Sequence, residues 1–489
     1  MSVVGHLGGA VASVARAASI TLIALLCVVA YTAGSLRRLA IRDRAARTCH
    51  RERQRGRLLR WSFAQLGATF VKIGQVASSR PDVFSPGVID GLRSLQDRVP
   101  AFSYRRVRAV LARELGAPIE ERFRSFDPVP LAAGGIAQVH RAELMDGTPV
   151  AVKVLRPRVR ARAHRDGRLL LWLAHIAHAV SARARTGDAI GHARRLVTGL
   201  VAQTDLRREA RNNERFRLAF RESRDVAFPR VYPEWSTRDV LVMELVHGTP
   251  LLEIAGEHSD HVTRSLREAF FAMCFERGMV HADLHPGNVL VRDDGVVVLL
   301  DLGLVTYLSP TTIDTVVDFT RCMVLGDAHD LVAHLRKYHR APRDIRWTTV
   351  EADATAFIAE LRRQSVAQLE VGSVVSRLFG LARKHHIRPM PQLSLVLLGM
   401  VTIEGIAKRL DPRANTAAEI ARYLGPRLAA GGPRLARGSR EFRRGANGQL
   451  LALSPRGVAQ PPREHDRDRE LVPGEESEDR AGRPEHRPR

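Results

Sequence analysis

The sequence predicts an α+β fold with two lobes, a small strand-rich lobe followed by a larger helical lobe. Residues 127–155 alternate short apolar strands with a glycine-containing loop and a tight turn, and residues 280–303 contain two strands and a turn rich in polar side chains. Residues 311–338 and 349–410 have apolar residues at helical spacing. A chain of 489 residues, 45% of them hydrophobic, can bury such a domain and carry extensions.

The N-terminal segment predicts a helix that crosses a membrane. Ala17–Leu36 contains no charged residue, and its twenty residues would span about 30 Å as a helix. Ten arginines follow between residues 37 and 60, whereas only Arg16 precedes the segment. This asymmetry predicts a cell-membrane protein whose remaining chain is cytoplasmic. A cleaved signal peptide and a buried or interfacial helix are the alternatives.

Residues 61–126 predict a helical extension. Its apolar residues recur at helical spacing: Phe63, Leu66, Phe70 and Ile73. Lys72 and Gln75 are three residues apart and therefore share one helix face, and Gly74 between them allows close approach to another element. On physical grounds alone this is an amphipathic helical hairpin with a lysine whose stem lies on apolar surface.

The strand-rich lobe supplies the groups expected around a nucleotide. Ala133, Gly134 and Gly135 lie in a loop whose small residues would let the backbone approach phosphates closely. Lys153 ends the strand Val-Ala-Val-Lys, the position from which a kinase lysine pairs the α- and β-phosphates. We predict Glu209, on a following helix, as the acid that orients Lys153.

Glu214 is a weaker candidate for that role. Val240–Glu244 predicts the last strand of the lobe, which leads into a hinge whose backbone would bind the adenine edge. Met243 and Glu244 would then line the nucleotide pocket, although Met243 is equally well explained as a core residue.

The segment Val280–Gly303 carries the strongest functional signal. Four residues separate Asp283 from Asn288, and Asp301 opens an Asp-Leu-Gly after a strand, a turn and a strand. In kinases this layout sets one carboxylate beside the attacking hydroxyl, while an amide and a second carboxylate hold Mg²⁺ against the phosphates of ATP. We therefore predict Asp283 as the catalytic base and Asn288 and Asp301 as the metal ligands.

Several motifs resemble those of known families. His-Ala-Asp-Leu-His-Pro-Gly-Asn at 281–288 resembles the loop of aminoglycoside and choline phosphotransferases and of AarF/UbiB-like atypical kinases. Lys-Ile-Gly-Gln at 72–75, Ser-Arg-Pro-Asp at 79–82 and Leu-Gln-Asp-Arg-Val-Pro at 95–100 resemble the extension that marks the AarF/UbiB-like family. Antibiotic-resistance phosphotransferases lack that extension. The resemblance covers roughly residues 58–412.

The resemblance implies a protein-kinase-like fold, the use of Mg²⁺ and ATP for phosphotransfer or ATP hydrolysis, and a role in isoprenoid quinone (ubiquinone or menaquinone) biosynthesis or lipid homeostasis at a membrane. Its partners would be a membrane lipid or quinone precursor and possible enzymes of that biosynthesis. Lys72 and Gln75 would be regulatory. The family usually has Glu-x-Asp before the glutamate helix, but this chain has Gln203-Thr204-Asp205, which leaves Asp205 as the expected charged partner of Lys72.

Two other functions stay open at this point. One is a small-molecule phosphotransferase of the aminoglycoside or choline kinase type, which the extension disfavours. The other is a membrane scaffold without enzymatic activity that keeps nucleotide binding as a switch. Gly134 and Gly135 also replace the Ala-Ser usual in the family, so nucleotide preference does not carry over.

Composition narrows the partners. The net charge is +24, with only five lysines among the 76 basic residues, and aromatic residues make up 5%. Because no basic run is interleaved with stacking rings, we expect contact with anionic lipid rather than nucleic acid. The four cysteines lack paired or metal-ligand spacing, which predicts free thiols and no structural zinc.

The C-terminal segment, rich in Pro, Gly, Arg and Glu, predicts a disordered tail. We therefore divide the chain into five parts: 1–60, the membrane helix and basic linker; 61–126, the extension; 127–245, the strand-rich lobe; 246–425, the helical lobe; and 426–489, the tail.

Overall fold

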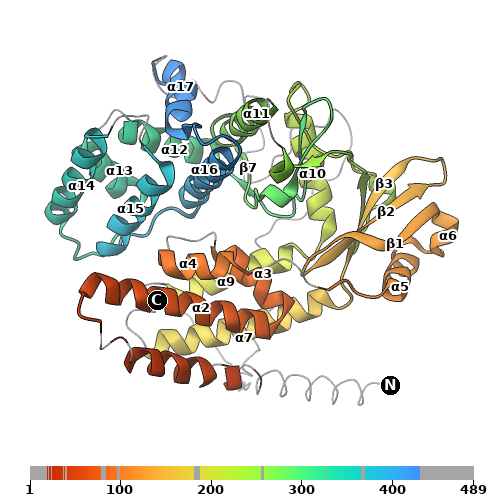
Figure 1. Cartoon of the computed structure of the whole chain (residues 1–489), viewed down its shortest axis with the longest axis horizontal. Helices are drawn as coiled ribbons and strands as arrows, with labels where there is room; N and C mark the ends of the chain where they lie inside the picture. Colours follow the sequence, from red (N-terminus) through yellow and green to blue (C-terminus); the bar gives the residue numbers. More distant parts are fainter. Residues whose placement is uncertain are drawn as a thin grey trace, which may run out of the picture. The chain divides into compact units, whose positions relative to one another are not determined.

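The structure is a computed structural model of the chain, and it describes most of residues 19–38 and residues 41–429 apart from six internal segments. These segments are 79–83, 96–99, 181–187, 255–257, 325–326 and 365–368. Both predicted lobes are present in the described chain, together with a group of helices formed mainly by the N-terminal extension (Figure 1).

The strand-rich lobe is built on a four-stranded antiparallel sheet in the order β1-β2-β3-β5. Its strands are β1 (Phe123–Ala133), β2 (Ala137–Leu144), β3 (Pro149–Leu155) and β5 (Val240–Glu244). Alternation along β3 points Val150, Val152 and Val154 to one face, where all three are fully buried, and Lys153 to the other. The predicted strands of this lobe are confirmed.

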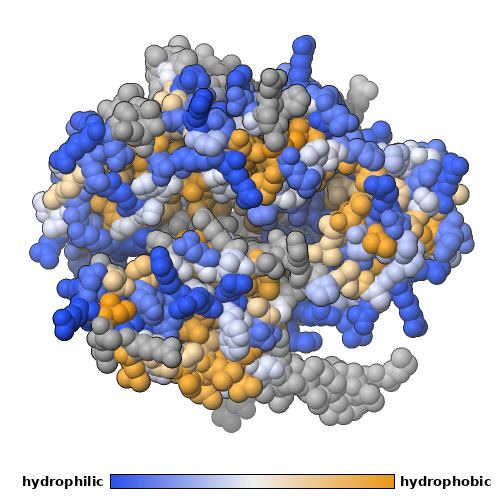
Figure 2. Space-filling model, in the orientation of Figure 1, coloured by the Kyte–Doolittle hydropathy of each residue, from blue (hydrophilic) through white to orange (hydrophobic). Residues whose placement is uncertain are grey.

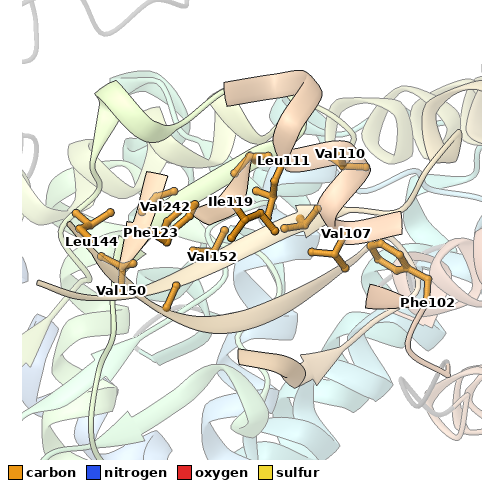
Figure 3. Packing of buried hydrophobic residues seen from close by; sticks show 13 residues of the cluster. Phe102, Val107, Val110, Leu111, Ile119, Phe123, Leu144, Val150, Val152 and Val242 are labelled. Carbon is orange, nitrogen blue, oxygen red and sulfur yellow. The ribbon is translucent and has the colours of Figure 1, made fainter. Parts of the chain in front are cut away.

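Two helices cover the valine face of this sheet. They are α5 (Tyr104–Leu115) and α6 (Ile119–Arg122). Val107, Val110 and Leu111 recur at helical spacing and pack against the β3 valines in one buried core (Figure 3). The apolar stripe of α5 therefore packs on the sheet, and β1 begins at residue 123, shortly before the predicted boundary at residue 126.

A separate group of helices forms around the predicted Lys-Ile-Gly-Gln helix. Its members are α2 (Arg44–Leu66), α3 (Ala68–Ser78), α4 (Pro86–Arg93), α7 (Val159–Val180) and α9 (Ala189–Ala202). Phe70 and Ile73 of α3 pack with Ala163 of α7 and Leu200 of α9 in one cluster. The α7–α9 hairpin was not predicted, and residues 44–60, predicted as a linker, form the first part of α2.

The helical lobe follows the prediction more closely. Its main helices are α11 (His258–Ala272), α12 (Pro310–Val324), α13 (Ala328–Tyr338), α14 (Trp347–Arg362), α15 (Val371–Lys384), α16 (Pro391–Leu410) and α17 (Thr416–Ala429). Leu393, Val396 and Ile403 of α16 are buried, which confirms this apolar run as core. Helix α17 extends past the predicted boundary at 425, and residues 430–489 lie outside the described residues.

The N-terminal residues pack on α2. Residues 25–36 are helical, and Gln54 of α2 donates a hydrogen bond to the carbonyl oxygen of Ala30 at 2.9 Å. Part of the predicted membrane helix, Ala17–Leu36, lies outside the described residues. Among the residues that are described, no helix is both long enough and apolar enough to cross a membrane.

All four cysteines are free thiols, as predicted. Cys322 lies near Asp318 and His334, with the potential ligand atoms of the three residues within 4.8 Å of one another. Cysteine spacing in the sequence does not reveal this group, because its three residues lie on two helices, α12 and α13. Arg321 donates a hydrogen bond to Asp318 at 3.0 Å, so a cationic side chain already accompanies this carboxylate.

Candidate active site

Two short strand pairs hold the catalytic segment. One pair is β7 (Met279–His281) with β10 (Val305–Tyr307), and the other is β8 (Val289–Val291) with β9 (Val297–Leu299). The second pair belongs to a sheet that also contains β4 (Val226–Ala227) and β6 (Thr249–Pro250). The loop with Asp283 and Asn288 connects β7 to β8, and Asp301 follows β9. The paired strands therefore fix the two loops relative to each other.

His281 links these two loops. Its buried ring accepts a hydrogen bond from the backbone nitrogen of Asp283 at Nδ1, and Nε2 lies 3.0 Å from the carbonyl oxygen of Leu300. Since Nδ1 acts as acceptor, Nε2 carries the proton and donates to Leu300. Asn288 adds a second link, because its side-chain nitrogen donates to the backbone oxygen of Asp283 at 3.0 Å.

Lys153 makes the ion pair that the sequence predicted. Its Nζ lies 2.7 Å from Oε1 and 2.9 Å from Oε2 of Glu209, which belongs to α10 (Leu206–Ala219). The same Nζ lies 3.1 Å from Oδ1 of Asp301. Glu214, the weaker candidate, instead pairs with Arg217 on the surface.

Charge pairing sets the protonation of this cluster. Burial alone would lower the pKa of Lys153, but the carboxylates of Asp301 and Glu209 raise it well above its usual range. Burial opposes ionisation of Asp301, yet Lys153 and Lys72 together hold its pKa well below the usual range. Asp301 is therefore an anion and Lys153 a cation throughout the physiological pH range. Burial also raises the pKa of Glu209, with Lys153 opposing that shift.

The backbone of Asp301 is held in the left-handed region, with φ of 54°. This conformation is uncommon for residues other than glycine and is often found at functional sites. Gly303 leaves room for it, because a Cβ there would lie 3.1 Å from Oδ1 of Asp301 and 3.2 Å from Oε2 of Glu209. The glycine of Asp-Leu-Gly thus accommodates both carboxylates.

These residues line one cavity of about 850 Å³ between the two lobes. From the strand-rich lobe it is lined by the predicted residues Ala133, Gly134, Gly135, Lys153, Glu209, Met243 and Glu244. Gln203, at the C-terminal end of α9, also lines it. From the helical lobe it is lined by Asp283, Asn288 and Asp301. The structure therefore brings the predicted nucleotide, catalytic and metal residues together.

The extension also reaches the cavity, but with a different partner than expected. Nζ of Lys72 lies 3.2 Å from Oδ2 of Asp283, the predicted catalytic base. The expected pairing of Lys72 with Asp205 is wrong, because Asp205 caps α10 and forms an ion pair with Arg207 at 2.9 Å. The side chain of Gln75 lies outside the described residues.

One wall of the cavity was not predicted from the sequence. Leu398, Val401, Thr402 and Gly405 of α16 line it, together with Ser78 and Leu95 from the extension. The four α16 positions follow the spacing i, i+3, i+4 and i+7, which places them on one face of the helix. Gly405, a glycine inside a predicted helix, was the one sequence feature that indicated a special role for this face.

A lysine–glutamate pair, a metal-turn aspartate and a catalytic-loop aspartate, gathered between a strand-rich lobe and a helical lobe, define a kinase-like protein. The chain matches the ABC1 atypical kinase-like domain over residues 94–335 and the UbiB helical domain over residues 354–415.

Its relatives give the family. It is 31% identical over 384 residues to a protein named probable protein kinase UbiB from Azotobacter vinelandii, covering 74% of this chain and 70% of the relative. It is 32% identical over 402 residues to one of the same name from Pseudomonas fluorescens strain SBW25, covering 77% and 73%. The chain therefore belongs to the UbiB family of atypical kinases, as its motifs predicted.

A solved structure was also found, entitled the complex structure of Rv3197-erythromycin from Mycobacterium tuberculosis. It aligns with a TM-score of 0.49 and 23% sequence identity, covering 66% of this chain and 83% of the other.

Proposed function

We propose that this protein binds Mg²⁺ and ATP in the interlobe cavity and uses the γ-phosphate for phosphotransfer or hydrolysis in support of isoprenoid quinone biosynthesis. The observation that carries the proposal is the contact of Lys153 with both Glu209 and Asp301, in a cavity that also contains Asp283 and Asn288. Membership of the UbiB family supports the kinase-like role and the link to quinone biosynthesis.

The nucleotide would lie against the strand-rich lobe. Gly134 and Gly135 offer a loop without bulky side chains, and Lys153, held by Glu209, offers a cation for the α- and β-phosphates. Met243 to Val246 provide the wall where the adenine would bind. The ammonium of Lys153 is fixed before the nucleotide arrives, which reduces the entropy lost on binding.

The donors of Asn288 and Asp301 fit a magnesium ion. Both side chains line the cavity, and amide and carboxylate oxygens are the hard ligands that Mg²⁺ prefers. The lowered pKa of Asp301 keeps it ionised, as a metal ligand must be. When bound, the ion would offset the negative charge on the phosphates.

Phosphotransfer would use Asp283 as the base. The acceptor oxygen forms a bond to the γ-phosphorus while the bond from that phosphorus to the β,γ-bridging oxygen breaks. ADP leaves with the electron pair, and the acceptor proton passes to the carboxylate of Asp283. In the described structure Nζ of Lys72 lies 3.2 Å from Oδ2 of this carboxylate, so the ammonium would compete with the acceptor for the base.

Membrane contact is part of the same proposal. We define the apolar surface as Trp172, Leu173, Ile176 and Val180 of α7 with Leu22, Leu25, Leu26 and Val29 near the N-terminus, all exposed. Within each segment these residues recur at helical spacing. Ile23 and Leu170 pack on one cluster, which brings the two segments together. Figure 2 shows apolar side chains gathered over this part of the molecule.

Two substitutions test the active site. Asp301→Asn should remove the melting-temperature increase caused by Mg²⁺ and ATP, because the metal loses its carboxylate. Asp283→Asn should keep that increase but lower turnover by about 10²-fold or more, as expected for loss of a general base. Asp294→Asn is the control, since this exposed aspartate lies in the turn between β8 and β9 and pairs with Arg292.

Equal ligand-induced melting shifts for wild type and Asp301→Asn would remove the metal assignment. If Mg²⁺ and ATP bind but Asp283→Asn turns over ATP as fast as wild type, Asp283 is not the base. If wild type binds Mg²⁺ and ATP but shows no turnover, the ion pair between Lys72 and Asp283 would favour the nucleotide-switched scaffold.

A further inference from the structure

The interlobe cavity has a wall that the nucleotide does not explain. Leu398, Val401, Thr402 and Gly405 of α16 line the same cavity as Asp283, but they belong to the helical lobe, away from the strands and loop expected to hold ATP. In phosphotransfer the acceptor approaches from the side of the catalytic base, roughly in line with the leaving oxygen. The α16 face is therefore placed to meet an acceptor.

This face is uncharged. Its four residues are two aliphatic side chains, one threonine and one glycine, and Thr402 donates its hydroxyl proton to the carbonyl oxygen of Leu398 at 3.0 Å. The extension adds Ser78 and the side chain of Leu95, which is 6% exposed. Lys72 is a cation that the extension contributes, and it already contacts Asp283. An anionic or strongly polar acceptor would find little compensation for its lost hydration here.

Gly405 gives the wall its shape. A glycine inside a helix costs about 1 kcal/mol relative to alanine, so its presence needs a reason. Close helix packing is not the reason, because a Cβ built at Gly405 would meet no atom within 4 Å. Gly405 is exposed and lines the cavity, so its missing side chain leaves the cavity open at this point.

We propose that the α16 face, formed by Leu398, Val401, Thr402 and Gly405, is a binding subsite for an uncharged apolar molecule that carries a hydroxyl group. The apolar body of the molecule would lie along α16, and its hydroxyl group would reach Asp283. Ligand pockets commonly combine an apolar lining with a few polar groups that orient the ligand. The subsite rests on the proposed function, since it defines the class of acceptor for the same active site. It also disfavours peptide substrates, because the extension and α16 both border the space beside the base.

The test uses 1-octanol as the probe on the full chain, with octanoate and choline as charged comparisons. Binding is measured from the probe-dependent melting shift in the presence of saturating Mg²⁺ and ADP. Octanol should bind saturably, and octanoate and choline should bind at least tenfold more weakly. Gly405→Leu, which adds four carbons to the open side of the cavity, should weaken octanol binding at least tenfold while the shift caused by Mg²⁺ and ADP persists.

Gly380→Leu is the matched control. Gly380 is also inside a helix, α15, a Cβ there would also meet no atom within 4 Å, and it does not line the cavity. It should gain similar helix stability and bind octanol like wild type. If Gly405→Leu fails to fold, Thr402→Leu is a second variant that narrows the cavity at the same face of α16.

The outcomes separate the subsite from the proposed function. If wild type shows no shift with Mg²⁺ and nucleotide, the proposed function fails. If nucleotide binds but octanol does not, the subsite is overturned and the nucleotide site stands. The same holds if octanol binds equally to wild type and to a folded Gly405→Leu or Thr402→Leu variant. If octanoate or choline binds as tightly as octanol, the proposed ligand class, an uncharged apolar molecule, is overturned.

Discussion

At the residue scale, Lys72 contacts Asp283, the proposed base. Its ammonium lies 3.2 Å from the carboxylate, and its side chain is only 17% exposed. A partly buried charge that loses its partner is left uncompensated, so this pair is sensitive to substitution. Lys72→Ala should therefore change basal ATP hydrolysis or the ratio of ATP to ADP affinity severalfold without unfolding the protein.

The measurement is steady-state ATP hydrolysis together with ATP and ADP affinities. Lys384→Ala is the control, because Lys384 pairs with Asp353 at an exposed site. Gln203→Glu belongs to the same experiment. Its buried amide nitrogen has no hydrogen-bond partner, and a carboxylate at this cavity position should tighten the hold on Lys72. If Lys72→Ala and Gln203→Glu both behave like wild type, Lys72 does not regulate the site.

A residue's role could be predicted from the sequence where that role is tied to one strand or helix. Lys153, Glu209, Asp283 and Asp301 could be placed from sequence because each has a fixed position relative to a strand or helix in kinase chemistry. Asp205 could not, because two local roles competed. Asp205 directly precedes α10 and accepts a hydrogen bond from the backbone nitrogen of Arg207, so it caps the helix. The side chain of Arg207 also binds Asp205, and these local contacts replace the expected pair with Lys72.

At the element scale, α3 carries Lys72 to the cavity, and Gly74 sets how closely α3 packs. A Cβ on Gly74 would lie 2.3 Å from Cδ1 of Leu95 and 2.7 Å from Cδ2 of Phe63. Gly74→Ala should therefore shift α3 and cost about 1–3 kcal/mol of stability through overpacking. Because the shift moves Lys72, ATP hydrolysis should change in the same direction as in Lys72→Ala.

The control for this substitution is Gly199→Ala in α9. A Cβ there meets no atom within 4 Å, so the variant should be as stable as wild type or more stable. The double variant Lys72→Ala/Gly74→Ala should hydrolyse ATP like Lys72→Ala alone, since both changes act on one contact. Additive effects on hydrolysis would show that α3 influences the site by another route.

Elements differed in how well the sequence predicted them. The strands of the small lobe carry clear alternation, and their bounds were anticipated closely. Helix α5 was predicted as part of the extension, whereas it packs on the sheet. Helical spacing in Val107, Val110 and Leu111 shows that an apolar face exists but not which surface covers it. The α7–α9 hairpin was missed for a related reason, since one face of α7 is apolar but exposed and gives no core pattern.

At the scale of the whole molecule, charge and apolar surface support the proposed membrane contact. The net charge of +24 attracts anionic headgroups, and the apolar surface on α7 and the N-terminal segment has no covering element among the described residues. Arg162, Arg165 and Arg168 lie on α7 before its apolar half. A basic amphipathic helix of this kind binds at the interface of a bilayer by burying its apolar face below the headgroups.

The full-length protein should therefore sediment with vesicles of phosphatidylglycerol and phosphatidylcholine, and less with phosphatidylcholine alone. Trp172→Ser/Ile176→Ser should lower partitioning at least tenfold, because burying a large apolar side chain contributes about 1.5–3 kcal/mol. Met145→Ser/Leu252→Ser is the matched control, since both residues are exposed hydrophobics outside the apolar surface. High salt should weaken the binding of wild type without abolishing it, as the apolar contribution is not screened. Vesicle binding that disappears in salt, or that survives the α7 substitutions unchanged, would assign the contact to the arginines alone and leave the apolar surface without a role at the membrane.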